Sequence, residues 1–155
     1  SIIYLLLSLS LCISAVHVHL LQQKIDERSL ISENWVTKPK WFYKRDQDKP
    51  KVEDLSLKAD GTSVSGNSSG FWKIETSKIT GIQTLVVIIP RPNSDAFISY
   101  EVPVYPGKLY PGTVRFEKEG EIFYEAPGKA RKTIGRINFD IKKRYTDMLD
   151  PSFSR

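Results

Sequence analysis

Two histidines and one cysteine are the residues of this 155-residue chain best suited to chemistry. Imidazole and thiolate groups are common zinc ligands, and His17, His19 and Cys12 are the only such groups present. The two histidines lie two residues apart, which on a helix separates them by about 200°, so they cannot share one metal site. We therefore predict no metal site and no intramolecular disulfide, although in an assembly each histidine could meet a different neighbour or a cofactor.

The chain beyond residue 22 has no histidine and no cysteine, which excludes a Ser-His-Asp catalytic triad or a Cys-His catalytic dyad there. It also has no phosphate-cradling glycine loop, no dinucleotide fingerprint and no G-x-S-x-G motif. Glu117, Glu119 and Glu121 alternate around Lys118, a pattern typical of a solvated face rather than of acid–base catalysis. We expect no catalytic residues, no cofactor and no enzymatic activity.

Two positions match modification patterns. Asn67-Ser68-Ser69 matches the acceptor pattern for N-glycosylation, within a segment rich in glycine and serine. Cys12 could carry a lipid, but a cysteine in an apolar segment is more often a small apolar residue.

The first 22 residues contain no Asp, Glu, Lys or Arg, unlike the charged remainder of the chain. A helix of this length spans roughly 33 Å, close to the ~30 Å hydrocarbon core of a bilayer. We therefore predict a single-pass membrane anchor, with residues 1–34 forming the anchor helix and its exit turn. Small residues at Ser8, Ser10, Ser14 and Ala15 would let neighbouring helices approach. The strictly apolar part, residues 2–16, is also as long as a secretory signal core, and a membrane-surface helix is a further alternative.

Aromatic and basic residues are interleaved directly after this segment. Prolines 39 and 50 disfavour a helix, so we predict that residues 35–69 form an extended juxtamembrane linker followed by a glycine- and serine-rich loop. Indole, phenol and basic groups favour the lipid head-group layer. The predicted membrane-interface residues are Trp35, Lys38, Lys40, Trp41, Phe42, Tyr43, Lys44 and Arg45. The same composition could stack on single-stranded nucleic acid, but membrane contact explains it more simply, so no nucleic-acid partner is expected.

Strand patterns dominate residues 70–155. Residues 84–89 form a β-branched run typical of a buried strand, residues 97–105 and 133–145 alternate, and residues 114–125 look like a hairpin with Gly120 in its loop. We predict a mainly β protein in which one transmembrane helix precedes a small antiparallel β-sandwich or barrel-like domain. The predicted core residues are Leu85, Val87, Ile89, Phe116, Ile122, Ile137, Phe139 and Ile141.

These features favour a non-catalytic, single-pass subunit of a larger membrane assembly, with the β-domain bracing or capping an extramembrane partner. The expected partners are other membrane subunits and lipid, and the net charge of +5 suits anionic lipid or acidic proteins. The basic residues after the anchor favour a cytoplasmic side for the domain, whereas glycosylation at Asn67 would require the opposite side.

An apolar N-terminal helix followed by a β-domain resembles the outline of a type IV pilin. That resemblance implies a filament of identical subunits, the one case in which a homo-oligomer is expected. The chain departs from the bacterial pattern, because Leu5 stands where many members carry an acid and no paired C-terminal cysteines are present. A third hypothesis, a lipid-surface binding module, rests on the basic cluster between Lys38 and Lys51.

Overall fold

A computed structural model describes residues 2–9, 24–43 and 51–142 of the chain. The protein is mainly β, as the sequence predicts. The elements of the domain are α2 (Glu27–Ser32), β1 (Trp35–Trp41), β2 (Glu53–Leu57), β3 (Thr62–Ser65), β4 (Ser68–Thr76), β5 (Gln83–Pro90), β6 (Phe97–Pro106), β7 (Val114–Arg115), β8 (Gly120–Glu125) and β9 (Lys132–Ile141).

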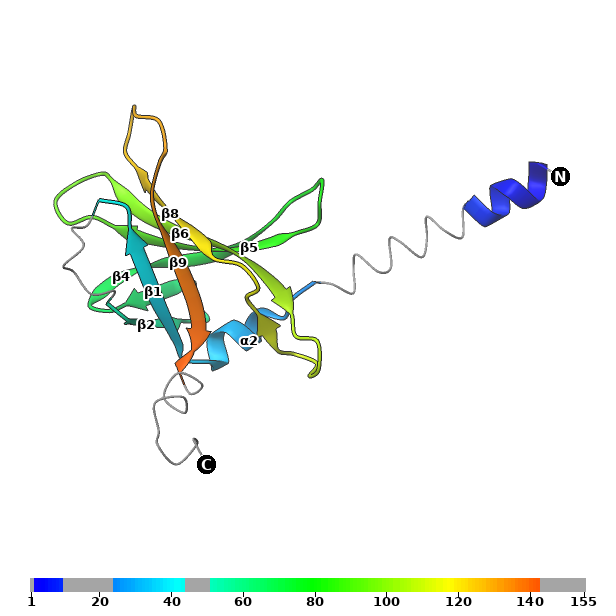
Figure 1. Cartoon of the computed structure of the whole chain (residues 1–155), viewed down its shortest axis with the longest axis horizontal. Coiled ribbons are helices and arrows are strands. Elements are labelled where there is room, and N and C mark those ends of the chain that lie inside the picture. The colour runs from blue at the N-terminus through cyan, green and yellow to red at the C-terminus, as the bar shows by residue number, and fades with distance from the viewer. Residues whose placement is uncertain (1, 10–23, 44–50, 143–155) are drawn as a thin grey trace.

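Eight of these strands close into an antiparallel barrel (Figure 1). The order around the sheet is β5-β4-β3-β2-β1-β9-β8-β6, and β6 pairs with β5 to complete the ring. β7 is a short additional strand that pairs only with the end of β6. Closure satisfies the backbone groups that an open sheet would leave exposed at its edges.

The barrel interior is filled by alternate side chains of each strand. On β9, Ile137 and Phe139 point into the core, whereas Arg136 and Asn138 are exposed, so this predicted alternation is confirmed. Five of the predicted core residues are buried, namely Leu85, Val87, Ile122, Ile137 and Phe139; Ile89, Phe116 and Ile141 are partly buried and pack against them. Side chains typically fill the interior of an eight-stranded barrel, as they do here.

The short helix α2 lies at the end of the barrel where β1 begins and β9 ends (Figure 1). Asp26 caps its N-terminus, because its carboxylate accepts the backbone N–H of Arg28 at 3.0 Å. The side-chain hydrogen bonds from Arg28 lower the pKa of Asp26. Leu30 anchors the helix, since its side chain is fully buried and its carbonyl accepts the indole N–H of Trp35 at 2.9 Å.

Because neighbouring strands are antiparallel, the strand pairing shows at which end of the barrel each loop lies. Loops 58–61, 77–82 and 107–113 lie at the same end as α2, which we call the α2 end. Loops 91–96 and 126–131 lie at the opposite end. The described domain begins at the α2 end, where the backbone N–H of Ile25 donates to Gln83 Oε1 at 2.7 Å.

The predicted hairpin over residues 114–125 is wrong. β7 pairs with β6 through Val114 and Pro106, while β8 pairs with β6 and β9, so the two halves of that segment do not pair with each other. Gly120 begins β8 rather than occupying a loop. A Cβ atom there would lie 2.6 Å from the carbonyl oxygen of Glu101, so the close approach of β6 requires glycine.

The structure also corrects the linker predicted over residues 35–69, because these residues contribute β1, β2, β3 and the start of β4 to the barrel. β1 alternates Trp35, Thr37 and Pro39 inward with Lys38 and Lys40 outward. Proline is tolerated there because β2 pairs only with the Trp35–Thr37 part of β1, so Pro39 has a strand on one side alone.

Residues 2–9 are helical, and their large apolar side chains are 53–77% exposed. Among the described residues, no helix has the length and apolarity needed to cross a membrane. Within the region predicted as anchor helix and exit turn, residues 24–26 are not helical and α2 begins at Glu27. Cys12, His17, His19 and the predicted helix-packing residues Ser10, Ser14 and Ala15 lie outside the described residues.

Candidate functional site

A groove with a volume of about 470 Å³ opens at the α2 end of the barrel. Four elements form its walls: α2, the start of β1, the end of β9, and the segment that runs from the β6–β7 loop through β7. Its lining residues include Ser29, Ser32, Trp35, Lys108, Leu109, Tyr110, Thr113, Val114, Arg115, Phe116, Phe139 and Ile141.

Three aromatic rings that contact one another belong to the apolar lining of the groove, together with Leu109, Val114 and Ile141. The rings of Trp35 and Phe116 meet edge to face with centroids 5.2 Å apart, and those of Phe116 and Phe139 lie 5.3 Å apart. Phe116 therefore bridges the other two rings. Edge-to-face and tilted ring pairs are favourable geometries that hold aromatic side chains in fixed positions.

The β6–β7 loop, residues 107–113, forms the outer wall. It is closed by the backbone N–H of Gly107, which donates to the carbonyl of Thr113 at 2.8 Å. The Thr113 hydroxyl donates to the carbonyl of Tyr110 at 2.6 Å. These bonds fix the loop backbone and leave the side chains of Leu109 and Tyr110 exposed.

The polar groups of the groove carry both signs of charge. Arg115 donates from Nε to the carbonyl of Pro106 at 2.9 Å, pairs with Glu117, and lies 5.2 Å from the centre of the Tyr105 ring. Glu33 and Asp140 line the same groove as Lys108. With acids and bases both present, the groove has no strong preference for an anion or a cation, and its aromatic rings are the dominant feature.

The predicted membrane-interface residues are divided between the core and the surface. Trp35 is 2% exposed, so its prediction as an interfacial residue is wrong: its indole belongs to the core and the groove. Trp41 is partly buried, whereas Phe42 and Tyr43 are exposed. Lys44 and Arg45 lie outside the described residues.

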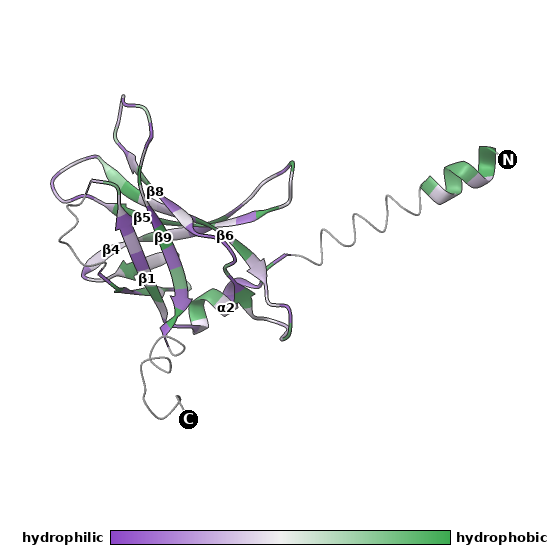
Figure 2. Ribbon diagram, viewed as in Figure 1, coloured by the Kyte–Doolittle hydropathy of each residue, from purple (hydrophilic) through white to green (hydrophobic). Residues whose placement is uncertain are grey.

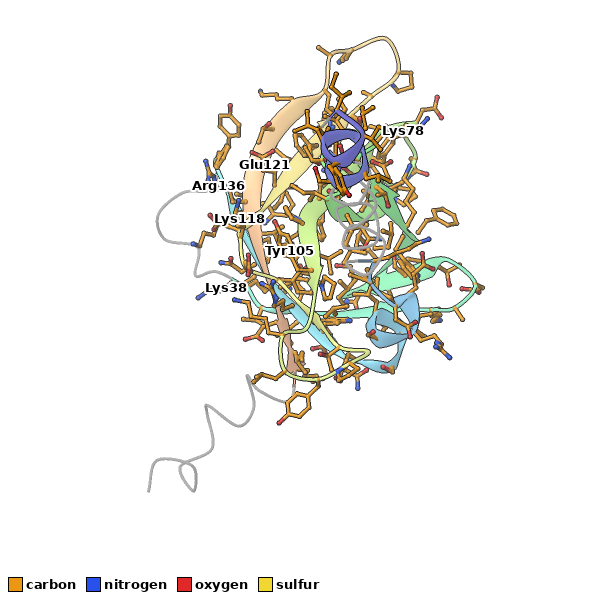
Figure 3. All side chains as sticks on the ribbon, turned by 90° about the vertical axis from the view of Figure 1, so that its right-hand side faces the viewer. Lys38, Lys78, Tyr105, Lys118, Glu121 and Arg136 are labelled. Atoms are coloured by element: carbon orange, nitrogen blue, oxygen red, sulfur yellow. The ribbon has the colours of Figure 1, made fainter. Side chains whose placement is uncertain are left out.

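Lys38 and Lys40 point outward from β1, next to β9. Lys40 pairs with Glu119 at 3.1 Å, and Arg136 lies 3.9 Å from the same carboxylate. Figure 3 shows Lys38, Lys118 and Arg136 on one side of the barrel. This surface is basic but partly neutralised by Glu119.

The other predicted positions are separate from the groove. Ser8 is exposed on the helix over residues 2–9, where its hydroxyl donates to the carbonyl of Leu5 at 2.9 Å. Asn67 is exposed in the turn between β3 and β4. Within the described ranges, no group of three His, Cys, Asp or Glu residues is arranged to hold a metal ion.

Sequence reasoning missed the groove. Its outer wall was visible as two turn signals, Pro106-Gly107 and Pro111-Gly112, which bracket the loop. The aromatic cluster had no comparable signal, because its three rings are far apart in the sequence. Comparisons with protein-family models, with curated proteins and with solved structures gave no match to this chain.

Proposed function

We propose that this protein is a non-catalytic binding protein that holds a small, mainly apolar molecule in the groove at the α2 end. The observation that carries the proposal is the aromatic cluster of Trp35, Phe116 and Phe139 in a groove of about 470 Å³. Ligand sites in proteins are typically concave, about 300–1,000 Å³ in volume, and lined by apolar and aromatic groups with a few polar ones.

The residues that line the groove indicate what kind of ligand it binds. The aromatic rings in the lining favour a ligand with an aromatic or aliphatic body, because apolar surface leaves water there and ring edges and faces complement each other. Arg115 already has the Pro106 carbonyl, Glu117 and Tyr105 as partners, so a charged ligand group would gain little from it. Thr113 and Lys108 at the rim supply hydrogen-bond donors for one polar substituent.

Filling the groove is expected to abolish most of this binding. Val114 is partly buried on the groove wall, so Val114→Trp should occupy space that a ligand needs. The affinity for the uncharged probe N-phenyl-1-naphthylamine, measured by its fluorescence enhancement with the full chain, should fall at least about tenfold.

The matched control is Ile134→Trp. Ile134 is also β-branched, partly buried and packed against the core, but it does not line the groove. Its variant should keep the wild-type affinity, and thermal unfolding should show both variants folded. Equal affinity in wild type and Val114→Trp, or equal loss in both variants, would contradict the proposal.

We propose as a second candidate the non-catalytic, single-pass subunit of a membrane assembly, with the apolar segment 1–22 as its anchor. The apolar side chains exposed on the helix over residues 2–9 favour it, because such a surface needs lipid or protein to cover it. In this hypothesis other membrane subunits are the partners, and the barrel braces one of them outside the bilayer.

The second candidate predicts the size of the native particle. Gently solubilised from its native membrane, the chain should migrate in native electrophoresis with a complex of defined size much larger than its own 17.7 kDa. Deleting residues 1–22 should remove it from that complex. Fibres or an open-ended ladder would instead favour the pilin-like arrangement, and recovery as a lone monomer would exclude both.

A further inference from the structure

We infer that two loops at the α2 end, 77–82 and 107–113, form a docking edge for the surface of a bilayer that contains anionic lipid. Loop 107–113 is also the outer wall of the groove, but this inference concerns the exposed side chains at the loop tips and does not require the groove ligand proposed above. It also places membrane contact elsewhere than the Trp35–Arg45 segment that the sequence indicates.

Each loop carries large apolar side chains in water at its tip. Ile79 is 96% exposed in loop 77–82, and Leu109 and Tyr110 are 84% and 70% exposed in loop 107–113. Figure 2 shows apolar colouring at the tips of both loops. A single exposed apolar residue needs no explanation, but several at one end of a barrel indicate a surface that something apolar covers.

The two loops share one end of the molecule. β5 begins directly after loop 77–82, β6 ends directly before loop 107–113, and Gln83 of β5 pairs with Val104 of β6. Both loops project toward the right-hand side of Figure 1. Gln83 also holds Ile25, so the apolar N-terminal part of the chain joins the domain beside the same two loops.

Hydrogen bonds within each loop hold these tips in place. Ser77 Oγ accepts the backbone N–H groups of Ile79 and Thr80 at 3.3 and 3.2 Å, and its carbonyl accepts that of Gly81 at 2.9 Å. Loop 107–113 is closed by the Thr113 bonds described above. Rigid tips lose little conformational entropy when they enter another phase.

The charges of the two loops indicate which kind of surface they bind. A lysine directly precedes the apolar tip in both loops, as Lys78-Ile79 and Lys108-Leu109, and neither loop contains Asp or Glu. Figure 3, which looks at the molecule from the side to which the loops project, shows Lys78 on that side. Apolar tips that enter the acyl boundary, with lysines at head-group level, match an anionic lipid surface.

The test places a tryptophan reporter at each tip of the full chain. Ile79→Trp and Leu109→Trp are compared on vesicles of phosphatidylcholine and phosphatidylserine whose acyl chains are brominated near the head groups, because bromine quenches indole only on contact. The added emission of both variants over wild type should fall by about half or more, since interfacial side chains reach ~5–10 Å into this layer.

Ala130→Trp is the matched control, because Ala130 is exposed in a loop at the opposite end and also follows a lysine, Lys129. Its emission should not be quenched. If residues 1–22 alone hold the protein on the vesicle, the two loop reporters will be as unquenched as Ala130→Trp, and that result would overturn the inference.

Lysine variants test the choice of lipid. Lys78→Gln and Lys108→Gln should each weaken docking of the loop reporters about fivefold on phosphatidylserine vesicles, and Lys129→Gln should not. The difference should disappear at high salt, because screening removes the attraction of exposed charges. Equal quenching on pure phosphatidylcholine, with no effect of either lysine, would contradict the anionic surface.

Discussion

Trp35→Ala is expected to lower the free energy of unfolding by about 4–5 kcal/mol, the largest loss of any single substitution considered for this protein. Trp35 is 2% exposed and packs edge to face on Phe116. Its indole N–H also donates to the carbonyl of Leu30, so truncation leaves a buried acceptor without its donor. The substitution thus removes ring burial, a ring pair and the connection between β1 and α2 together.

Urea unfolding measures this loss. Trp41→Ala is the control, because Trp41 is at the other end of the same strand and only partly buried, and it should cost about 1–2 kcal/mol. If Trp35→Ala does not fold, Trp35→Phe keeps a smaller aromatic ring but loses the N–H and part of the buried indole volume, with an expected loss of about 2–3 kcal/mol. A loss at Trp35 no larger than that at Trp41 would show that Trp35 does not connect α2 to the barrel.

The fold was predictable from the sequence wherever the apolar and polar pattern of a single strand determines which of its residues are buried. The alternation of β9 and the apolar run of β5 gave their elements and inner faces directly, because period-2 burial is a local property of a half-buried strand. Closure of the barrel was not predictable in this way. It depends on β5–β6 pairing and on β1–β9 pairing, which joins residues about a hundred positions apart.

β1 shows why composition misled the interpretation of residues 35–69. Three aromatics and several lysines after an apolar segment suggested a membrane interface, and Pro39 suggested a linker. The alternation of Trp35 and Thr37 with Lys38 and Lys40 was present in the same residues. Burial of Trp35 follows that alternation rather than the preference of indole for head groups, because strand pairing on both sides fixes which face is inside.

The groove depended on tertiary structure more than any other feature. Trp35, Phe116 and Phe139 come from β1, the segment after β7, and β9, and only closure of the barrel brings their rings together. Two of the three, Phe116 and Phe139, were predicted as core residues from strand patterns. Their role in lining a groove required α2 and the β6–β7 loop, whose positions no periodic pattern specifies.

The docking edge inferred above corresponds in the sequence to two dipeptides, Lys78-Ile79 and Lys108-Leu109, from which no membrane contact was predicted. Their meaning required the register, since Gln83 and Val104 place both loops at one end. Apolar residues at loop tips conflict with the usual polar chemistry of turns, and such conflicts are expected at functional surfaces.

The second large effect is a loss of stability in alkaline solution, caused by Tyr100. Its side chain points into the barrel, and burial raises the pKa of Tyr100 to about 12, with a further contribution from the nearby charge of Glu53. The unfolded chain releases this proton near pH 10. The stabilisation is therefore complete below pH 10 and is lost as the pH rises to about 12, at about 1.4 kcal/mol per pH unit.

The difference between wild type and Tyr100→Phe isolates this effect from lysines and from other tyrosines. Phenylalanine keeps the buried ring and has no proton to lose, so urea unfolding should show the wild type losing up to about 3 kcal/mol more than Tyr100→Phe between pH 9 and 12. Tyr110→Phe, at an exposed loop tip, should show the same pH dependence as wild type. Identical pH profiles for wild type and Tyr100→Phe would show that the phenol does not remain neutral in the folded barrel.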